Sequence, residues 1–265
     1  HPTVEVQGVV AALEELPDSF EVVLVGDEAL IRRELDTLGR AQDGRLSIVH
    51  AAERIEPNEA PAVAVRRKPD SSIVVGIGLQ KEGRADAFVS AGSTGAVMAA
   101  SLLMLRPLPG VDRPAIAAMV PTSKGPMVLL DAGANVDCKP ENLVQFARLG
   151  AVYARDVLGR GTPRVGLLNI GEEPEKGDEL AVETHRRLTA SELNFVGNVE
   201  GREIIEGACD VLVADGFVGN VLLKFYESVA GFVLGLLHRD LGEGGKDSPE
   251  DRVARILDYA EYGGA

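Results

Sequence analysis

The sequence has no tryptophan, 4% aromatic residues and only two cysteines, Cys138 and Cys209. Two thiols are too few for a disulfide framework, and their spacing is not the Cys-x-x-Cys of a structural zinc site. We therefore expect a reducing, cytoplasmic setting. Basic residues are scarce as well, because 27 Lys and Arg stand against 41 Asp and Glu, a formal net charge of −14. So acidic a chain offers no broad surface for DNA or RNA, and we expect no nucleic-acid partner.

Long apolar runs are also rare. The uncharged stretch at residues 87–105 has the length of a membrane span, but polar residues and glycines at 90–95 divide it. This pattern predicts a buried strand, a turn and a helix, and no transmembrane helix. The chain opens on His1 and Pro2 without a signal-peptide pattern and closes on Tyr262-Gly-Gly-Ala265. We expect that both ends are cut.

A short Val/Ile/Leu-rich run, a glycine-containing polar turn and an amphipathic segment recur along the chain. This alternation predicts a mostly parallel sheet with helices on both faces. No Ser/Gly/Pro-rich linker divides the chain, so we expect a single α/β domain over residues 1–265. The predicted strands span residues 20–27, 85–92, 128–133, 164–171 and 210–216, and the predicted helices span 28–38, 94–105, 140–158, 178–188, 221–237 and 252–259, with a polar loop at 242–249.

Four polar turns follow predicted strands, at residues 90–95, 131–137, 169–177 and 215–220. The carboxyl edge of an open α/β sheet is where ligands bind, and glycine lets backbone N–H groups approach an anion. Any single turn is explained as well by the glycine that strand-to-helix connections need. Four turns with Ser, Thr, Asn or Asp favour a phosphate or carboxylate site instead. The candidate binding residues are Gly92, Ser93, Thr94, Gly95, Asp131, Gly133, Asn135, Asn169, Gly171, Asp215, Gly216 and Gly219.

Two side chains in these turns are candidates for a catalytic role. Lys176 can bind phosphate or stabilise an oxyanion, and Asn220 can donate to a carbonyl oxygen. Each has a structural alternative. Lys176 lies among acidic neighbours that would pair with it, and Asn220 would serve as the N-cap of a helix beginning near Val221.

The usual signs of covalent or cofactor chemistry are missing from these turns. No histidine falls in them and no Gly-x-Ser-x-Gly elbow occurs, while Cys138 is better explained by packing than as a nucleophile. Gly76-Ile-Gly78 has Lys81 where a dinucleotide fingerprint needs its third glycine. Acids of the 169–177 turn could in principle hold Mg²⁺, yet no carboxylate–histidine motif accompanies them. We therefore expect neither a cofactor nor a resident metal.

One basic cluster, Arg66, Arg67 and Lys68, stands out against the acidic background. It could dock an acidic partner protein, because opposite potentials steer encounter. The alternative is a solvated helix face.

Nine strings resemble, in order and over nearly the whole chain, the PlsX family of bacterial phosphate acyltransferases. They begin at residues 90, 112, 130, 139, 165, 175, 195, 215 and 262 and read SAGSTGA, DRPA, LDAGANVD, KPE, VGLLNIG, EKGDE, FVGNVE, DGFVGNV and YGGA. The resemblance implies a three-layer α/β/α Rossmann-like fold of the isopropylmalate dehydrogenase-like type.

The resemblance also implies the reaction: reversible transfer of a fatty acyl group from acyl carrier protein to inorganic phosphate, giving acyl phosphate for phospholipid synthesis. Lys176 and Asn220 match the family's catalytic lysine and asparagine, and we assign them to phosphate or oxyanion stabilisation and to the thioester carbonyl. The glycine turns would hold phosphate and the pantetheine end of the donor, and the basic cluster would dock the carrier protein. The family implies a cytosolic homodimer with peripheral membrane contact and contact with a downstream glycerol-3-phosphate acyltransferase.

The chain departs from the family pattern in four places. The family's first strand and its Asp-Ala-Met-Gly-Gly-Asp turn would precede His1, and family chains run on past Ala265. Residues 237–259 are shorter and more polar than the membrane-facing segment of relatives, and Ser93 stands where relatives usually have Asn. Two competing functions remain: a coenzyme A-dependent phosphate acetyl- or butyryltransferase, and a non-catalytic scaffold that binds carrier protein.

Overall fold

A computed structural model describes residues 2–16 and 20–241 of the chain. It divides into two compact units at the boundary between Leu108 and Pro109, and each unit is described by itself. The single domain over residues 1–265 stays a prediction. The predicted polar loop at 242–249 and helix at 252–259 lie outside the described residues.

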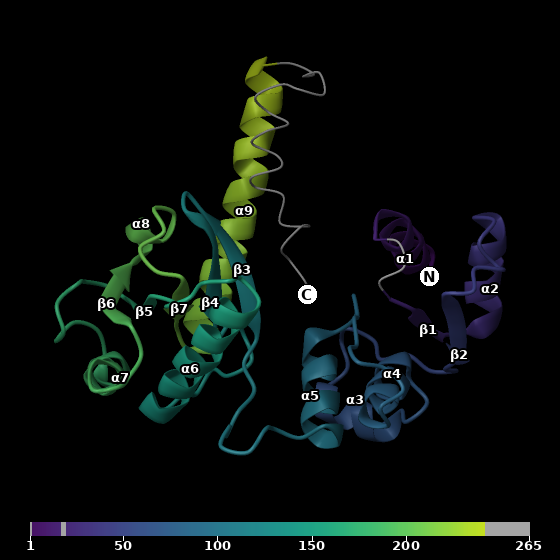
Figure 1. The fold of residues 1–265 in the computed structure, drawn as a ribbon, viewed down its shortest axis with the longest axis horizontal. Helices are drawn as coiled ribbons and strands as arrows, with labels where there is room; N and C mark the ends of the chain where they lie inside the picture. Colours follow the sequence, from purple (N-terminus) through teal and green to yellow (C-terminus); the bar gives the residue numbers. More distant parts are fainter. Residues whose placement is uncertain (1, 17–19, 242–265) are drawn as a thin grey trace. The chain divides into compact units, whose positions relative to one another are not determined.

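Unit 1 combines a small parallel sheet with two groups of helices (Figure 1). Val6, Leu24, Ile31 and Leu35 form one buried cluster between the sheet and its two helices. A second cluster lies between three further helices and includes Val65, Ile77 and Ala100. The elements in order are α1 (Thr3–Glu15), β1 (Val22–Gly26), α2 (Glu28–Thr37), β2 (Leu46–His50), α3 (Pro61–Arg67), α4 (Ser72–Lys81) and α5 (Thr94–Met104).

The strand predicted at residues 85–92 does not form. The segment is irregular, and Val89 is 92% exposed. A run of apolar residues becomes a strand only where a neighbouring strand accepts its hydrogen bonds, and no described segment of unit 1 pairs with this one. The helix predicted after it is confirmed as α5.

Unit 2 contains a five-stranded sheet in the order β3-β4-β7-β5-β6. Strands β4, β7, β5 and β6 run parallel, and β3 is antiparallel at the edge. The elements in order are β3 (Ala117–Thr122), β4 (Gly125–Leu130), α6 (Pro140–Asp156), β5 (Val165–Asn169), α7 (Glu179–Thr189), β6 (Phe195–Glu200), α8 (Gly201–Ile204), β7 (Val211–Val213) and α9 (Gly216–Leu241).

Both faces of this sheet are covered, which confirms the predicted three-layer arrangement. Val128 and Leu130 of β4 face α6, whose Phe146 is fully buried. Met127 and Leu129 of the same strand point to the opposite face of the sheet, which α8 and α9 cover. Alternate residues of one strand therefore serve two cores, as a doubly covered parallel sheet requires.

Helix α9 begins five residues earlier than predicted and carries an apolar character that the sequence analysis missed. Within the described chain, Gly216–Gly235 is long and apolar enough to cross a membrane, with a mean hydropathy of 1.4 and 11% of the stretch buried. Leu222, Leu223 and Tyr226 nevertheless pack on the sheet. The helix thus has one face in the core of unit 2 and another that is exposed.

Candidate active site

Three of the four predicted turns meet at one edge of the unit 2 sheet. Val213 of the central strand β7 pairs with Leu130 of β4 on one side and with Leu167 of β5 on the other. Neighbouring strands lie about 5 Å apart, so the loops that leave β4 and β5 start about 10 Å from one another. The expected convergence of turns is therefore confirmed for those at 131–137, 169–177 and 215–220.

The fully buried carboxylate of Asp131 organises the loop after β4. Its Oδ1 accepts from the N–H groups of Gly133 at 3.1 Å and Ala134 at 3.0 Å. Its Oδ2 accepts from the backbone N–H of Asn135 at 2.7 Å and from its Nδ2 at 2.8 Å. In this loop, the N–H groups that we expected to cradle phosphate donate to the Asp131 carboxylate instead. Asp131 and Asn135 therefore shape the loop, and these N–H groups are not free to bind an anion.

The amino end of α9 packs directly on this loop. The Asp215 side chain accepts from the N–H groups of Phe217 at 2.9 Å and Val218 at 3.0 Å, and so caps the helix. The Gly216 N–H donates to the Asn135 carbonyl at 2.7 Å. A Cβ on Gly219 would lie 1.9 Å from the Asp131 carbonyl oxygen, so only glycine fits there.

Asn220 lies in the first turns of α9, beside the loop after β4. Because α9 begins at Gly216 with Asp215 as its cap, the alternative assignment of Asn220 as an N-cap is wrong. Its side chain lies over Gly133, where a Cβ would come within 3.5 Å of the Asn220 Oδ1. The side chain is exposed and has no hydrogen-bond partner among the described residues. Its amide is therefore free to donate to a ligand.

Lys176 lies in the loop between β5 and α7. Hydrogen bonds of its backbone fix its place in this loop. The Lys176 N–H donates to the Glu173 carbonyl at 3.1 Å, and Asn169 Nδ2 donates to the Lys176 carbonyl at 2.9 Å. The aliphatic stem passes over Gly171, where a Cβ would meet Cγ at 2.8 Å. Gly177 has a φ of 94°, a left-handed conformation that suits glycine.

The ammonium of Lys176 forms no ion pair with any described residue. The expected alternative, pairing with the acids around it, is not observed: Glu172 pairs instead with Arg202 at 3.6 Å, and Asp178 caps α7 through Ala181 N–H at 2.8 Å. Lys176 is exposed. It is thus a cation held by its backbone and free at its tip.

Asn198 of β6 is a site residue that the sequence reasoning did not single out. It is 7% exposed, and its Nδ2 donates to the Glu173 carbonyl in the Lys176 loop at 2.8 Å. The only sequence signal was its place in the string at 195–200, because nothing local shows that a strand residue reaches a loop that begins 28 positions earlier.

The two cysteines are poor nucleophiles. Burial is the main factor that raises the pKa of Cys138, whose Sγ lies 3.3 Å from the Asn135 carbonyl. Burial also raises the pKa of Cys209 to about 12, and this residue precedes β7 at the opposite edge of the sheet. Neither thiol supplies a thiolate near neutral pH. No group of three or more potential metal-ligating side chains occurs in the described ranges.

The fourth turn belongs to unit 1. The Ser93 hydroxyl caps α5 by accepting from Ala96 N–H at 3.3 Å, and Thr94 opens the helix. The Ser90 hydroxyl accepts from Gly92 N–H at 3.1 Å, and a Cβ on Gly95 would lie 2.9 Å from the Pro61 ring. These residues form an ordered helix start, and their role in ligand binding stays a prediction.

The basic cluster separates into two kinds of residue. Lys68 pairs with Glu59 at 2.6 Å and donates to the Arg54 carbonyl at 2.9 Å, so it links the end of α3 to the segment before that helix. Arg66 and Arg67, in the last turn of α3, are exposed and have no ion-pair partner among the described residues.

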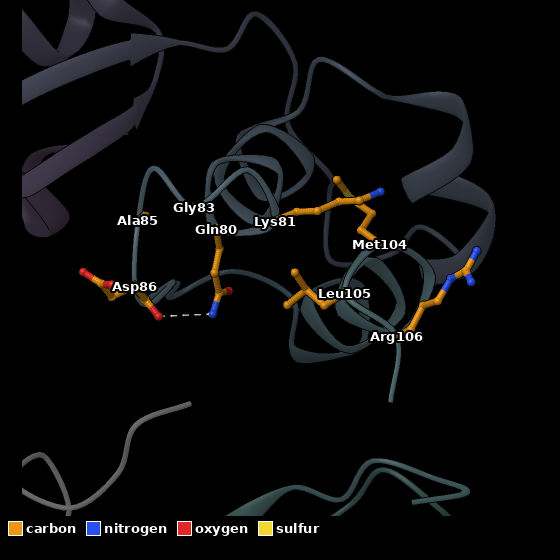
Figure 2. A pocket seen from close by; sticks show the side chains of 8 residues that line it. All are labelled: Gln80, Lys81, Gly83, Ala85, Asp86, Met104, Leu105 and Arg106. Atoms are coloured by element: carbon orange, nitrogen blue, oxygen red, sulfur yellow. Dashed lines mark hydrogen bonds between the residues drawn. The ribbon is translucent and has the colours of Figure 1, made fainter. Parts of the chain in front are cut away.

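A shallow hollow of about 770 Å³ also lies on unit 1, between α4 and the end of α5 (Figure 2). Lys81 and Arg106 line it together with Met104 and Leu105. It contains none of the predicted site residues. Gly76-Ile-Gly78 lies in the nearby α4 and has a structural role there, because a Cβ on Gly76 would overlap the Phe88 ring.

Comparisons with known proteins show which family this chain resembles. A family model described as fatty acid synthesis protein matches residues 1–264. The phosphate acyltransferase of Desulforamulus reducens is 50% identical over 267 residues, which cover 98% of this chain and 79% of the relative. The phosphate acyltransferase of Nostoc sp. is 48% identical over 275 residues, which cover 100% of this chain and 80% of the relative.

Solved structures share the fold at low identity. The EutD phosphotransacetylase from Staphylococcus aureus has a TM-score of 0.59 and 18% identity, covering 87% of this chain and 81% of its own. A branched-chain phosphotransacylase from Enterococcus faecalis has a TM-score of 0.54 and 16% identity, covering 98% of this chain and 95% of its own. These likenesses support the Rossmann-like α/β/α fold. With the family match over nearly the whole chain and relatives of about half identity, the chain belongs to the fatty acid synthesis protein family, the PlsX family of phosphate acyltransferases.

Proposed function

We propose that this acyltransferase takes a fatty acyl group from acyl-acyl carrier protein and transfers it to inorganic phosphate, supplying acyl phosphate for phospholipid synthesis. The observation that supports this best is the free Lys176 ammonium at a sheet edge whose loops contain no activated nucleophile. Phosphate is itself a nucleophile, so the protein needs to position two substrates and stabilise charge, not to form a covalent intermediate.

The reaction then needs only the groups present. A phosphate oxygen attacks the thioester carbon, and the carbonyl oxygen becomes an oxyanion. As the tetrahedral intermediate collapses, the C–S bond breaks, and the thiolate takes the proton that phosphate released. Lys176 binds phosphate or the oxyanion as a point charge, and the Asn220 amide donates to the carbonyl oxygen. Asp131, Asp215 and Gly219 fix the loops that carry these groups.

Arg66 and Arg67 would dock the carrier protein, since two exposed guanidinium groups on an acidic chain form a local positive surface. Lys68 adds less net positive charge to this surface, because it pairs with Glu59 at 2.6 Å.

The exposed apolar face of α9 is where we place the homodimer contact. Phe217, Val221, Phe225 and Phe232 are 63%, 55%, 65% and 66% exposed and recur at helical spacing along one stripe. Large apolar surfaces of this kind mark contacts with another chain or with lipid. A cytoplasmic location with peripheral membrane contact suits the product, a long-chain acyl phosphate, which a downstream glycerol-3-phosphate acyltransferase would consume there.

The test compares two donors. Purified full-length protein is given palmitoyl-acyl carrier protein or palmitoyl-coenzyme A with inorganic phosphate, and acyl phosphate is trapped with hydroxylamine. We expect product from the carrier-protein donor, at a kcat/KM far above that for coenzyme A. Product from coenzyme A alone would assign the chain to the coenzyme A-dependent class. No product with either donor, while carrier protein still binds, would assign it to the scaffold class.

A further inference from the structure

Asn198 reaches from β6 into the loop that carries Lys176. Its Nδ2 donates to the Glu173 carbonyl at 2.8 Å, while its Oδ1 is buried and has no partner among the described residues. The orientation of the amide follows from this bond, because only the nitrogen can donate to a carbonyl. The side chain thus makes a single long-range hydrogen bond and leaves its other polar atom unused.

The carbonyl that Asn198 holds is also the acceptor for Lys176. The Lys176 N–H donates to the same Glu173 oxygen at 3.1 Å, and Asn169 Nδ2 holds the Lys176 carbonyl at 2.9 Å. The peptide groups on both sides of the Lys176 Cα are therefore tied to strands, one to β6 through Glu173 and the other to β5 directly. Gly171 leaves room for the lysine stem.

An asparagine at this position is not explained by stability. A buried oxygen without a partner destabilises the folded state, and a leucine of the same branched shape would avoid that cost. What leucine cannot do is donate to the Glu173 carbonyl. The bond to the loop is hence the feature that distinguishes asparagine from an apolar residue here.

We propose that Asn198 is a positioning residue that fixes the backbone carrying the Lys176 side chain for acyl transfer to phosphate, through its hydrogen bond to the Glu173 carbonyl. The proposal rests on the proposed function in the role it gives Lys176. It requires that the loss of Asn198 act on the reaction only by way of Lys176.

The first measurement needs no substrate. Hydrogen exchange of the full-length protein is compared for the wild type, Asn198→Leu and Asn198→Asp. The control is Asn194→Leu, an exposed asparagine just before β6, at the strand's other end. We expect faster exchange at residues 173–177 in both Asn198 variants, with the melting temperature of Asn198→Leu unchanged or raised. Unchanged exchange in this loop would overturn the proposal.

The second measurement is a double-mutant cycle with Lys176→Arg, which keeps the charge but moves it. We expect Asn198→Leu alone to lower kcat between about 10- and 100-fold, with the KM for the acyl donor unchanged. In the Lys176→Arg background the same change should cost much less, because the lysine is already displaced. Equal losses in both backgrounds would show that Asn198 acts independently of Lys176 and overturn the proposal. The cycle is measured with the acyl donor that the wild type uses. If the proposed donor is wrong, the coupling between Asn198 and Lys176 can still be measured.

Discussion

Lys176 shows how a flexible side chain can be held at its base and free at its tip. Its backbone bonds to Glu173 and Asn169 fix the Cα, while the ammonium forms no ion pair in the described part of the chain. A lysine on an unanchored loop would lose backbone conformational entropy, in addition to side-chain entropy, each time it bound a ligand. The arrangement suits a point charge that must meet an anionic substrate.

Replacing Lys176 by Ala should lower kcat by about 100- to 1,000-fold, because the loss of one stabilising donor at a developing oxyanion has this magnitude. The melting temperature should stay the same, since the side chain is exposed. Acyl phosphate formation under saturating substrates measures the effect. A turnover equal to that of the wild type would remove Lys176 from the mechanism.

Gly219 tests the packing that places Asn220. A Cβ there would lie 1.9 Å from the Asp131 carbonyl oxygen, so Gly219→Ala must push α9 away from the loop after β4. We expect a loss of about 1–3 kcal/mol of unfolding free energy, typical of overpacking, and a loss of activity. Urea unfolding measures the first and the acyl phosphate assay the second.

The matched control for this change is Gly231→Ala on the same helix, where a Cβ has nothing within 4 Å. Alanine there should stabilise the protein by about 0.5–1 kcal/mol, because glycine is the weaker helix former. Equal unfolding free energies for Gly219→Ala and Gly231→Ala would mean that the close approach of α9 to the loop at Gly219 is not rigid.

At the scale of elements, α6 and α7 are joined by a charged pair network. Arg187 of α7 pairs with Glu141 of α6 at 2.9 Å and with Glu183 of its own helix at 2.6 Å. Glu183 also receives two hydrogen bonds from Arg186. Hydrogen bonds from Arg186 and then from Arg187 lower the pKa of Glu183 from 4.5 to about 2.

This network predicts a pH dependence of stability. The pKa of Glu183 is lower in the folded state, so its contribution is fully present above pH 4.5 and is lost as the pH falls towards about 2. In Glu183→Gln the decline of melting temperature over that range should be shallower than in the wild type. Glu192→Gln, an exposed acid without an ion pair in the described chain, is the control and should follow the wild-type curve.

The stripe on α9 predicts an effect on assembly. If a second copy covers it, Phe225→Glu with Phe232→Glu should convert a dimer to a monomer, because two carboxylates would be buried at the contact. Sedimentation equilibrium measures the mass. Lys224→Ala, on the same helix but paired with Glu227 at 2.9 Å, should leave the dimer intact. A monomer in the wild type would show that no second copy covers the stripe.

For the whole molecule, charge is distributed so that a positive patch stands out. The net charge of −14 would repel an acidic partner in general, so docking depends on local exceptions such as Arg66 and Arg67. Arg66→Glu with Arg67→Glu should raise the KM for acyl-acyl carrier protein about tenfold or more and leave the KM for phosphate unchanged.

The control for docking is a reversal of equal charge on unit 2, Arg148→Glu with Arg155→Glu on α6. It changes the net charge of the chain by the same amount and should alter the KM for the carrier protein much less. If both reversals change the KM for the carrier protein equally, the overall charge of the chain is the cause. If neither reversal changes this KM, Arg66 and Arg67 are residues of a solvated helix face.

Much of the site could be read from the sequence, because strand-to-helix turns are local. The strands at β4, β5 and β7, the helices at α6 and α7, and the meeting of three turns at one edge all follow from apolar periodicity and glycine position. The start of α9 was misplaced because Gly216 and Gly219 are poor helix formers taken alone. Their close approach to the loop after β4 requires glycine, and the Asp215 cap begins the helix in spite of them.

Local pattern, then, predicted a mostly parallel α/β fold and singled out Lys176 and Asn220 as candidate groups, and the resemblance of nine strings identified the family. Only the tertiary structure decided which polar groups are free. The Asp131 carboxylate accepts from Ile116 N–H, 15 positions earlier, and Lys68 pairs with Glu59, while the tips of Lys176 and Asn220 have no partner among the described residues. Hydrogen-bond and ion-pair partners come from whichever segments the fold brings near, and residue order along the chain does not specify them.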